Sequence, residues 1–192
     1  MNIFITGLAG FLGSSLGHRL LDMGHNVSGN DNFIGGYEDN LNAKFKFNKG
    51  DCKDFNFMRK ALDNIDTVIH CAATAYEGFS VFSPSFITKN IFESSVSTFS
   101  ASITNNVKKV IFCSSMARYG GQDYPFTEDM IVQPEDPYGI AKVAAENILK
   151  NLSKIHNFDY TILVPHNIVG PRQKYDDPYR NVLSIFLNRN LR

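Results

Sequence analysis

Short β-prone runs alternate with helical patterns along almost the whole chain, and this alternation constrains the fold more than any other feature. Runs rich in Val, Ile and Phe predict strands at residues 2–6, 26–31, 44–48, 67–71, 109–114 and 160–165. Helical patterns predict helices near residues 10–23, 55–64, 83–106, 137–156 and 181–191. Such alternation favours a doubly wound, mostly parallel α/β sheet with helices on both faces. Residues 120–135 carry glycine and proline without periodicity, which predicts an irregular loop.

Composition and charge narrow the possible functions. The 192 residues suit one domain with a sizeable core, and 19 basic and 19 acidic residues give a net charge of zero. A net charge of zero gives no electrostatic reason to propose nucleic acid or an anionic membrane as a partner, and no apolar run is long enough to span a bilayer. The first predicted strand begins at residue 2, which leaves no room for a signal peptide. We expect one cytoplasmic domain, residues 1–192.

Cysteine and histidine do not suggest a metal site. There are three cysteines, Cys52, Cys71 and Cys113, an odd number without C-x-x-C spacing. This pattern is typical of reduced thiols in the core of a cytosolic protein. The five histidines are scattered, without a metal-ligand pair at helical spacing. We therefore expect no bound metal.

A glycine-rich turn follows the first predicted strand. The segment TGLAGFLG has G-x-x-G-x-x-G spacing and opens a predicted helix. Gly7 permits a tight turn, Gly10 lets the backbone approach a pyrophosphate, and Gly13 allows the helix to pack closely on the strand. The N–H groups and the positive dipole end of the helix then face the phosphates.

The second predicted strand ends in a carboxylate, Asp31, at the distance where dinucleotide-binding proteins bind a ribose hydroxyl. Asn32 follows it, where an NADP-binding protein would often place an arginine, so the pair favours NAD. The alternative is an aspartate that only caps its loop. These features together predict a Rossmann fold.

Tyr138 and Lys142 lie at i and i+4 in DPYGIAK, on one face of a predicted helix whose N-cap is Asp136. Tyrosine has a pKa of ~10 and is a poor base at neutral pH, whereas a neighbouring ammonium lowers such a pKa by ~1–3 units. Ser114 and Ser115 end the preceding predicted strand, where a hydroxyl could hold a substrate oxygen. The alternative for these serines is turn capping.

These motifs occur in one order along the chain, and together the sequence resembles the extended short-chain dehydrogenases, in particular the NAD-dependent epimerase/dehydratase family. The resemblance runs from TGLAGFLG through VIHCAA and YGIAK to HNIVGPRQKYDDPYRN. It implies NAD as the cofactor, with three groups of residues around it. The pyrophosphate group is Gly7, Gly10, Phe11, Leu12 and Gly13. The adenosine group is Asp31 and Asn32 on the ribose, with Asp51 and Cys52 beside the adenine. The nicotinamide group begins with Ala72, Ala73 and Thr74, which would line the pyrophosphate and the nicotinamide ribose. It also includes Tyr138, Lys142 and His166, and Asn90 as the helix residue that would support the active site.

The resemblance also implies a catalytic set of Ser115, Tyr138 and Lys142, with Ser115 and Asn167 contacting the substrate. Met116, Ala117 and Arg118 follow Ser115, where dehydratases of the family place acidic side chains. This favours epimerisation at C4 of a nucleotide sugar of the UDP-glucose/UDP-galactose type through a 4-keto intermediate.

Two other functions remain open at this point. One is a one-way NAD-dependent alcohol dehydrogenase of the same family. The other is a non-catalytic NAD-binding protein, because the family's C-terminal substrate lobe is missing from a chain that stops at Arg192.

The resemblance further implies a homodimer. One predicted helix would contribute Phe92, Val96, Phe99 and Ile103 to its interface. Another would contribute Ile140, Ala144 and Ile148. The alternative is that the same side chains are buried on the sheet.

Overall fold

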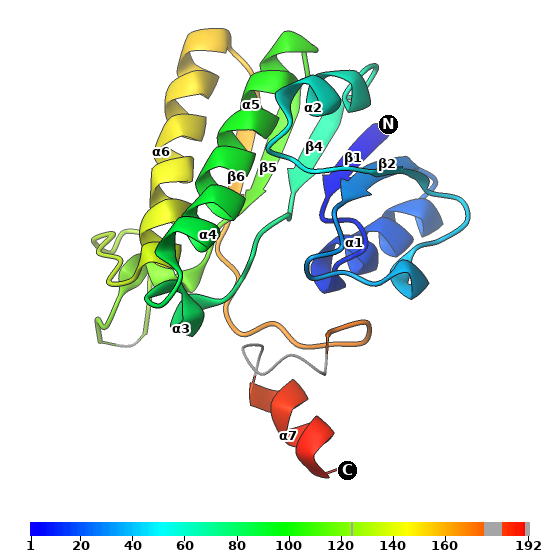
Figure 1. The fold of residues 1–192 in the computed structure, drawn as a ribbon. Coiled ribbons are helices and arrows are strands. Elements are labelled where there is room, and N and C mark those ends of the chain that lie inside the picture. The colour runs from blue at the N-terminus through cyan, green and yellow to red at the C-terminus, as the bar shows by residue number, and fades with distance from the viewer. Residues whose placement is uncertain (124, 175–181, 191–192) are drawn as a thin grey trace.

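The computed structural model describes residues 1–123, 125–174 and 182–190. Its centre is a parallel sheet of six strands in the order β3-β2-β1-β4-β5-β6, shown in Figure 1. The strands are β1 (Asn2–Thr6), β2 (Asn26–Asp31), β3 (Lys46–Lys49), β4 (Thr67–His70), β5 (Lys109–Cys113) and β6 (Asp159–Leu163). This order is that of the Rossmann fold, so the predicted fold class is confirmed.

Helices cover both faces of this sheet. On one face lie α2 (Phe55–Ala61), α5 (Ser94–Thr104) and α6 (Pro137–His156), packed on strand residues that include Phe4, Val68 and Phe112. On the other face α1 (Phe11–Asp22) packs over Ile3 and Ile5. Neighbouring residues of β1 therefore enter opposite cores, as expected for strands buried on both faces.

Several elements begin and end where the sequence predicts. Strands β1 and β2 and helix α6 match their predicted bounds. Strand β3 begins at Lys46 because residues 42–45 form a turn, closed by a 2.9 Å hydrogen bond from the Phe45 N–H to the Asn42 carbonyl. The loop at 120–135 is irregular in its described residues, as predicted.

The predicted helix at residues 83–106 is divided into three parts. Helix α4 (Pro84–Thr88) leads into a π-helical turn, η2 (Lys89–Glu93), and then into α5. The hydroxyls of Ser94 and Ser95 bind the carbonyls of Asn90 and Ile91, and side chains of this type compete with regular helical geometry. Turns of π-helix occur frequently at functional sites, and this one carries Asn90.

Four elements complete the fold. The sequence did not predict α3 (Glu77–Ser80), η1 (Glu38–Asn40) or η3 (Met116–Tyr119), which are too short to show a periodic pattern. Helix α7 (Val182–Asn190) corresponds to the last predicted helix, whose end residues lie outside the described part of the chain. Within the described residues, no helix combines the length and apolarity needed to cross a membrane.

Candidate active site

A cavity of about 530 Å³ opens at the carboxyl ends of the strands. Its wall includes residues that follow each of the six strands, among them Gly50 and Asp51 after β3, so one cavity collects the ends of the whole sheet. The chain reverses its direction across the sheet between β1 and β4, and open α/β sheets bind their ligands at such a switch point. Seventeen of the eighteen predicted site residues line this cavity. They are Gly7, Gly10, Phe11, Leu12, Gly13, Asp31, Asn32, Asp51, Cys52, Ala72, Ala73, Thr74, Asn90, Ser115, Tyr138, Lys142 and Asn167.

The glycine turn brings the backbone to the cavity wall. Gly7 has φ +71°, and a Cβ on it would lie 3.0 Å from the backbone of Ala72. A Cβ on Gly13 would lie 2.2 Å from the Gly7 carbonyl oxygen, so this helix can approach the turn only through glycine. Gly10 is the N-cap of α1 and has no side chain to offer to the first backbone N–H groups. These groups and the helix dipole suit an anionic ligand.

Asp31 ends β2 with a buried carboxylate. Oδ2 accepts a 3.0 Å hydrogen bond from the Ala9 N–H, and Oδ1 accepts one of 2.7 Å from the Phe33 N–H. Burial raises the pKa of this carboxyl, and the backbone hydrogen bonds partly offset that rise. Asp31 thus caps the glycine loop, as the alternative interpretation of the sequence has it, and also lines the cavity. Its contact with a ribose stays a prediction.

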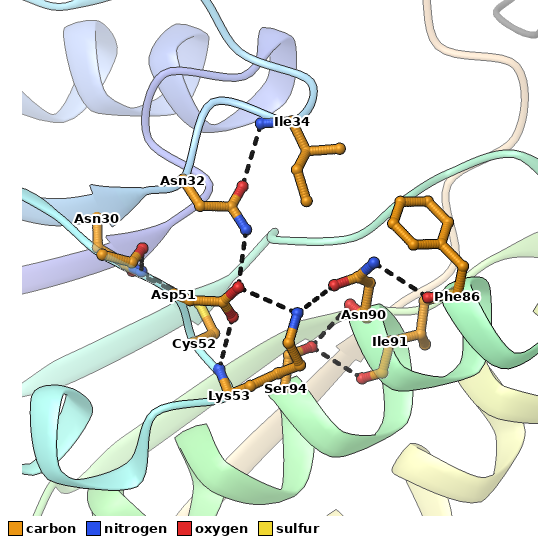
Figure 2. Close-up of polar contacts among 11 residues, drawn as sticks. Asn30, Asn32, Ile34, Asp51, Cys52, Lys53, Phe86, Asn90, Ile91 and Ser94 are labelled. Carbon is orange, nitrogen blue, oxygen red and sulfur yellow. Dashed lines mark hydrogen bonds and ion pairs between the residues drawn. The ribbon is translucent and has the colours of Figure 1, made fainter.

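A chain of polar contacts connects the predicted adenosine residues with Asn90 (Figure 2). The Asn32 amide donates to Asp51 at 3.1 Å, and Asp51 pairs with the Lys53 ammonium at 3.0 Å. Lys53 also donates to Oδ1 of Asn90, whose Nδ2 donates to the Phe86 carbonyl at 3.0 Å. Burial alone would raise the pKa of Asp51, but hydrogen bonds from Lys53 and Asn32 outweigh it and lower the pKa. Lys53 therefore fixes the orientation of Asn90, a role the sequence did not predict.

The first turns of α6 present Tyr138 and Lys142 to the cavity. Asp136 is the N-cap, as predicted, and accepts a 2.9 Å hydrogen bond from the Gly139 N–H. Burial raises the pKa of Tyr138 to about 12, and the nearby Ser115 side chain only partly offsets that rise. The Lys142 ammonium donates to the Cys113 carbonyl at 2.7 Å and lies 5.9 Å from the centre of the Tyr138 ring. Burial lowers the pKa of Lys142 to about 8.

A buried carboxylate supports this set from behind. Glu146, one turn beyond Lys142 on α6, is 1% exposed. It accepts a hydrogen bond from the Ser114 hydroxyl and forms an ion pair of 3.2 Å with Arg118. Ser114 precedes Ser115, and Arg118 lies in η3 just after it. Glu146 therefore ties the segment that carries Ser115 to the helix that carries Tyr138.

His70 joins three elements beneath the cavity. Nδ1 lies 2.7 Å from the Thr6 hydroxyl, and Nε2 lies 3.0 Å from the Ser95 hydroxyl. Ser95 donates its proton to the Ile91 carbonyl, so Nε2 carries the ring proton and Nδ1 accepts from Thr6. Burial lowers the pKa of this imidazole to about 3, and the Lys142 charge adds to the effect. His70 is a neutral structural link.

Two residues differ from the sequence-based expectation: His166, a predicted site residue, lies away from the cavity, and Glu77, which was not predicted, lies in its wall. His166 is exposed and does not line the cavity, and its Nε2 lies 3.1 Å from the amide of Asn167. Glu77 lines the cavity, although the sequence gave no motif for it. Burial raises the pKa of Glu77, and the nearby Asp136 carboxylate raises it further. No group of three or more His, Cys, Asp or Glu side chains suited to a metal occurs among the described residues.

Known proteins are similar to this chain in sequence over almost its whole length. The sequence profile described as "NAD dependent epimerase/dehydratase family" matches residues 3–192. A UDP-glucose 4-epimerase of Mycolicibacterium smegmatis is 34% identical over 97% of this chain and 62% of its own length.

Solved structures agree with this likeness. The UDP-glucose 4-epimerase of Thermotoga maritima, solved with UDP-glucose, has a TM-score of 0.93 and 34% identity, over 98% of this chain and 62% of that one. The UDP-glucose 4-epimerase of Thermus thermophilus, solved with NAD, has a TM-score of 0.93 and 28% identity over the same shares. The present chain thus spans about three fifths of the length of these relatives.

Proposed function

The chain belongs to the NAD dependent epimerase/dehydratase family, and from this membership we propose that it is the cofactor-binding and catalytic part of a nucleotide-sugar 4-epimerase. The proposed substrate is of the UDP-glucose/UDP-galactose type. The observation that carries the proposal is the single cavity that holds the glycine turn, Asp31 and the set of Ser115, Tyr138 and Lys142. The similar proteins of Mycolicibacterium smegmatis and Thermotoga maritima bear the same activity in their names.

The cavity suits NAD at two points. The turn at Gly7 and Gly13 has no space for a Cβ, and it presents the uncapped start of α1 to a pyrophosphate. Asp31 keeps lone pairs for a ribose hydroxyl, and its negative charge would repel a 2′-phosphate. We assign the other residues of the adenosine and nicotinamide groups that line the cavity to contacts with NAD as well. His166 is the exception, because it does not line the cavity.

The reaction divides among three side chains. The Tyr138 oxygen takes the proton of the sugar's 4-hydroxyl as base and later returns it, while the Ser115 hydroxyl holds the sugar oxygen. Lys142, fixed by the Cys113 carbonyl, supplies positive charge next to the tyrosine. When bound, NAD supplies the hydride acceptor and a nearby positive charge. Since burial raises the Tyr138 pKa to about 12, both positive charges are needed to bring that pKa toward neutrality.

The side chains around Ser115 favour epimerisation over loss of water. Met116, Ala117 and Arg118 have no carboxyl group to act as acid or base at this position. Glu77 places a carboxyl in the same cavity from another segment, so products of water elimination belong in the test.

The direct test is the interconversion of UDP-glucose and UDP-galactose, followed by chromatography, with this chain and with any longer protein that contains it. Tyr138→Phe should abolish the interconversion and retain NAD binding measured by calorimetry. Absence of interconversion with intact NAD binding would refute the epimerase assignment. Net formation of NADH during turnover would favour a one-way dehydrogenase, and NAD binding without nucleotide-sugar binding would favour a non-catalytic protein.

We also propose a cytoplasmic homodimer that pairs the outer faces of α4–α5 and α6. Phe92, Val96 and Ile103 are partly exposed on one side, and Ile140 is 53% exposed on the other. Phe99 does not belong to this surface: it is fully buried and packs edge-on against His70 and Phe112, so its predicted interface role is wrong. Light scattering that gives a monomer mass at all concentrations would defeat the dimer.

A further inference from the structure

Two thiols meet in the wall of the cavity. Cys113 ends β5, and Cys71 directly follows β4. The register of these neighbouring parallel strands pairs His70 with Phe112, so Cys71 and Cys113 are the next pair along. Their sulfur atoms lie 3.6 Å apart, and both residues line the cavity. The proposed reaction uses neither thiol.

The backbone positions fit a cross-link. Adjacent strands lie ~4.8 Å apart, and the two Cα atoms of a disulfide usually lie ~4.4–6.8 Å apart. The sulfurs need to approach from 3.6 Å to a bond length of ~2.05 Å, which side-chain rotation and a small shift of the strand ends can supply. Both thiols lie on the α1 face of the sheet, where Cys71 packs against the core.

The surroundings make one of the two thiols the nucleophile. The two thiols share a hydrogen bond in which either sulfur can donate, and this bond together with the Lys142 charge lowers the pKa of Cys113. The same hydrogen bond, with burial, raises the pKa of Cys71. The Lys142 ammonium binds the Cys113 carbonyl at 2.7 Å and so lies close to this residue, which favours Cys113 as the thiol that reacts first, with Cys71 in place to attack it next.

We propose that Cys71 and Cys113 form a dithiol that a peroxide converts to a disulfide, and that this disulfide weakens NAD binding. The second part rests on the proposed function, whereas disulfide formation itself does not. The Cys113 thiolate attacks one oxygen of the peroxide, forming a sulfenic acid and releasing hydroxide. The Cys71 thiol then attacks that sulfur, the S–O bond breaks, and its proton leaves with the oxygen as water. The hydroxide takes up the proton that the Cys113 thiol released on ionising, so two thiols lose two electrons and one peroxide becomes two molecules of water.

The disulfide acts on the site through its position. Cys113 supplies the carbonyl that fixes Lys142, and it is followed by Ser114 and Ser115. Ala72 and Ala73, which follow Cys71, lie in the same wall. Drawing the sulfurs together moves both strand ends at the predicted nicotinamide position. We expect NAD affinity to fall roughly tenfold, within the usual range of coupling between two sites.

The first experiment treats the NAD-free chain with hydrogen peroxide and maps its peptides by mass spectrometry. The expected product is a Cys71–Cys113 linked peptide that dithiothreitol reverses. Cys52 is the internal control, because burial raises its pKa to about 12 and it should stay reduced. In Cys71→Ser the sulfenic acid on Cys113 should accumulate and react with dimedone, whereas Cys113→Ser should give no adduct. Failure to find the linked peptide would overturn the proposal, whatever the chain's enzymatic activity.

The second experiment measures NAD affinity by calorimetry before and after oxidation. Oxidised wild type should bind roughly tenfold more weakly and recover after reduction, whereas oxidised Cys71→Ser should show no such reversible link-dependent loss. By reciprocity, saturating NAD should raise the midpoint potential of the pair by ~30 mV in a thiol buffer, because NAD favours the dithiol form and a tenfold change in a two-electron couple has this value. Equal NAD affinity in the linked and reduced forms would refute the effect on the site. If neither form binds NAD, the proposed function fails, while the dithiol assignment is decided by the peptide map.

Discussion

Glu146 offers a sharp test of how the segment that carries Ser115 is held. Replacing it with alanine removes the only carboxylate within ion-pair distance of Arg118 among the described residues. The Arg118 side chain is 12% exposed, so water cannot replace the lost partner fully. The Ser114 hydroxyl also loses its acceptor. Both groups stay in place, because η3 and the end of β5 hold them.

The magnitude follows from leaving a buried charge unpaired. Removing one member of a buried ion pair costs ~3–5 kcal/mol, and losing a buried acceptor costs ~1–3 kcal/mol when counted alone. The two losses overlap, so we expect Glu146→Ala to lower the free energy of unfolding by ~3–5 kcal/mol. The conversion Glu146→Leu with Arg118→Met removes both charges, and we expect it to cost at least ~2 kcal/mol less than the two single changes summed.

Urea unfolding followed by circular dichroism measures all of these variants. Lys150→Met is the matched control, because Lys150 lies 3.8 Å from the same carboxylate but its side chain is 44% exposed, so its loss should cost less than ~1 kcal/mol. A loss below ~1 kcal/mol for Glu146→Ala, or single losses that add without coupling, would show that the carboxylate does not bind the segment as described.

Three further predictions address pH and the cofactor. The pKa of His70 is about 3 in the fold, below its value of 6.5 in the unfolded state. The unfolded state therefore binds more protons, and lowering the pH from 6.5 to 3 should lower the free energy of unfolding by up to ~5 kcal/mol. In urea titrations at these pH values, His70→Gln should lack this acid dependence. The pKa of Lys142 is about 8 in the fold, below its value of 10.5 in the unfolded state. As the pH rises from 8 to 10.5, the free energy of unfolding of wild type should therefore gain up to ~3 kcal/mol relative to Lys142→Met. A difference between the two proteins that stays constant with pH would refute the shift. Asp31→Ala should weaken NAD binding in calorimetry by on the order of 1–3 kcal/mol, and unchanged affinity would mean that the ribose site is misplaced.

The sequence predicted the fold well because its signals are local. The five residues of β1 and the twenty of α6 have clear ends, marked in α6 by Asp136 as N-cap and Pro137 in the first turn. The division of the helix at 83–106 was not predictable in this way. It depends on Ser94 and Ser95 bonding back to η2, and serine in a helix gives no sign from the sequence alone that it will distort it.

The site was predictable where a motif carries backbone geometry or a fixed spacing. Gly7, Gly13, Tyr138 and Lys142 lie where their patterns place them. The sequence did not predict Lys53 and Glu77, because they belong to no motif and only the tertiary fold brings them to the cavity region. Distance along the chain carries no information about such encounters: Lys53 and Asn90, which the structure joins, are 37 residues apart.

Electrostatics was the least predictable part of the site, and the reason is burial. From the sequence, Lys142 next to Tyr138 predicts a tyrosine with a lowered pKa. In the fold, the Lys142 ammonium bonds to the Cys113 carbonyl and burial acts on both side chains, raising the pKa of one and lowering that of the other. Each shift makes the neutral form of its side chain more stable, so the protein alone does not prepare a base. Under the proposed function, NAD would supply the positive charge that the Tyr138 oxygen still requires, and proton removal would be coupled to the presence of NAD in the cavity.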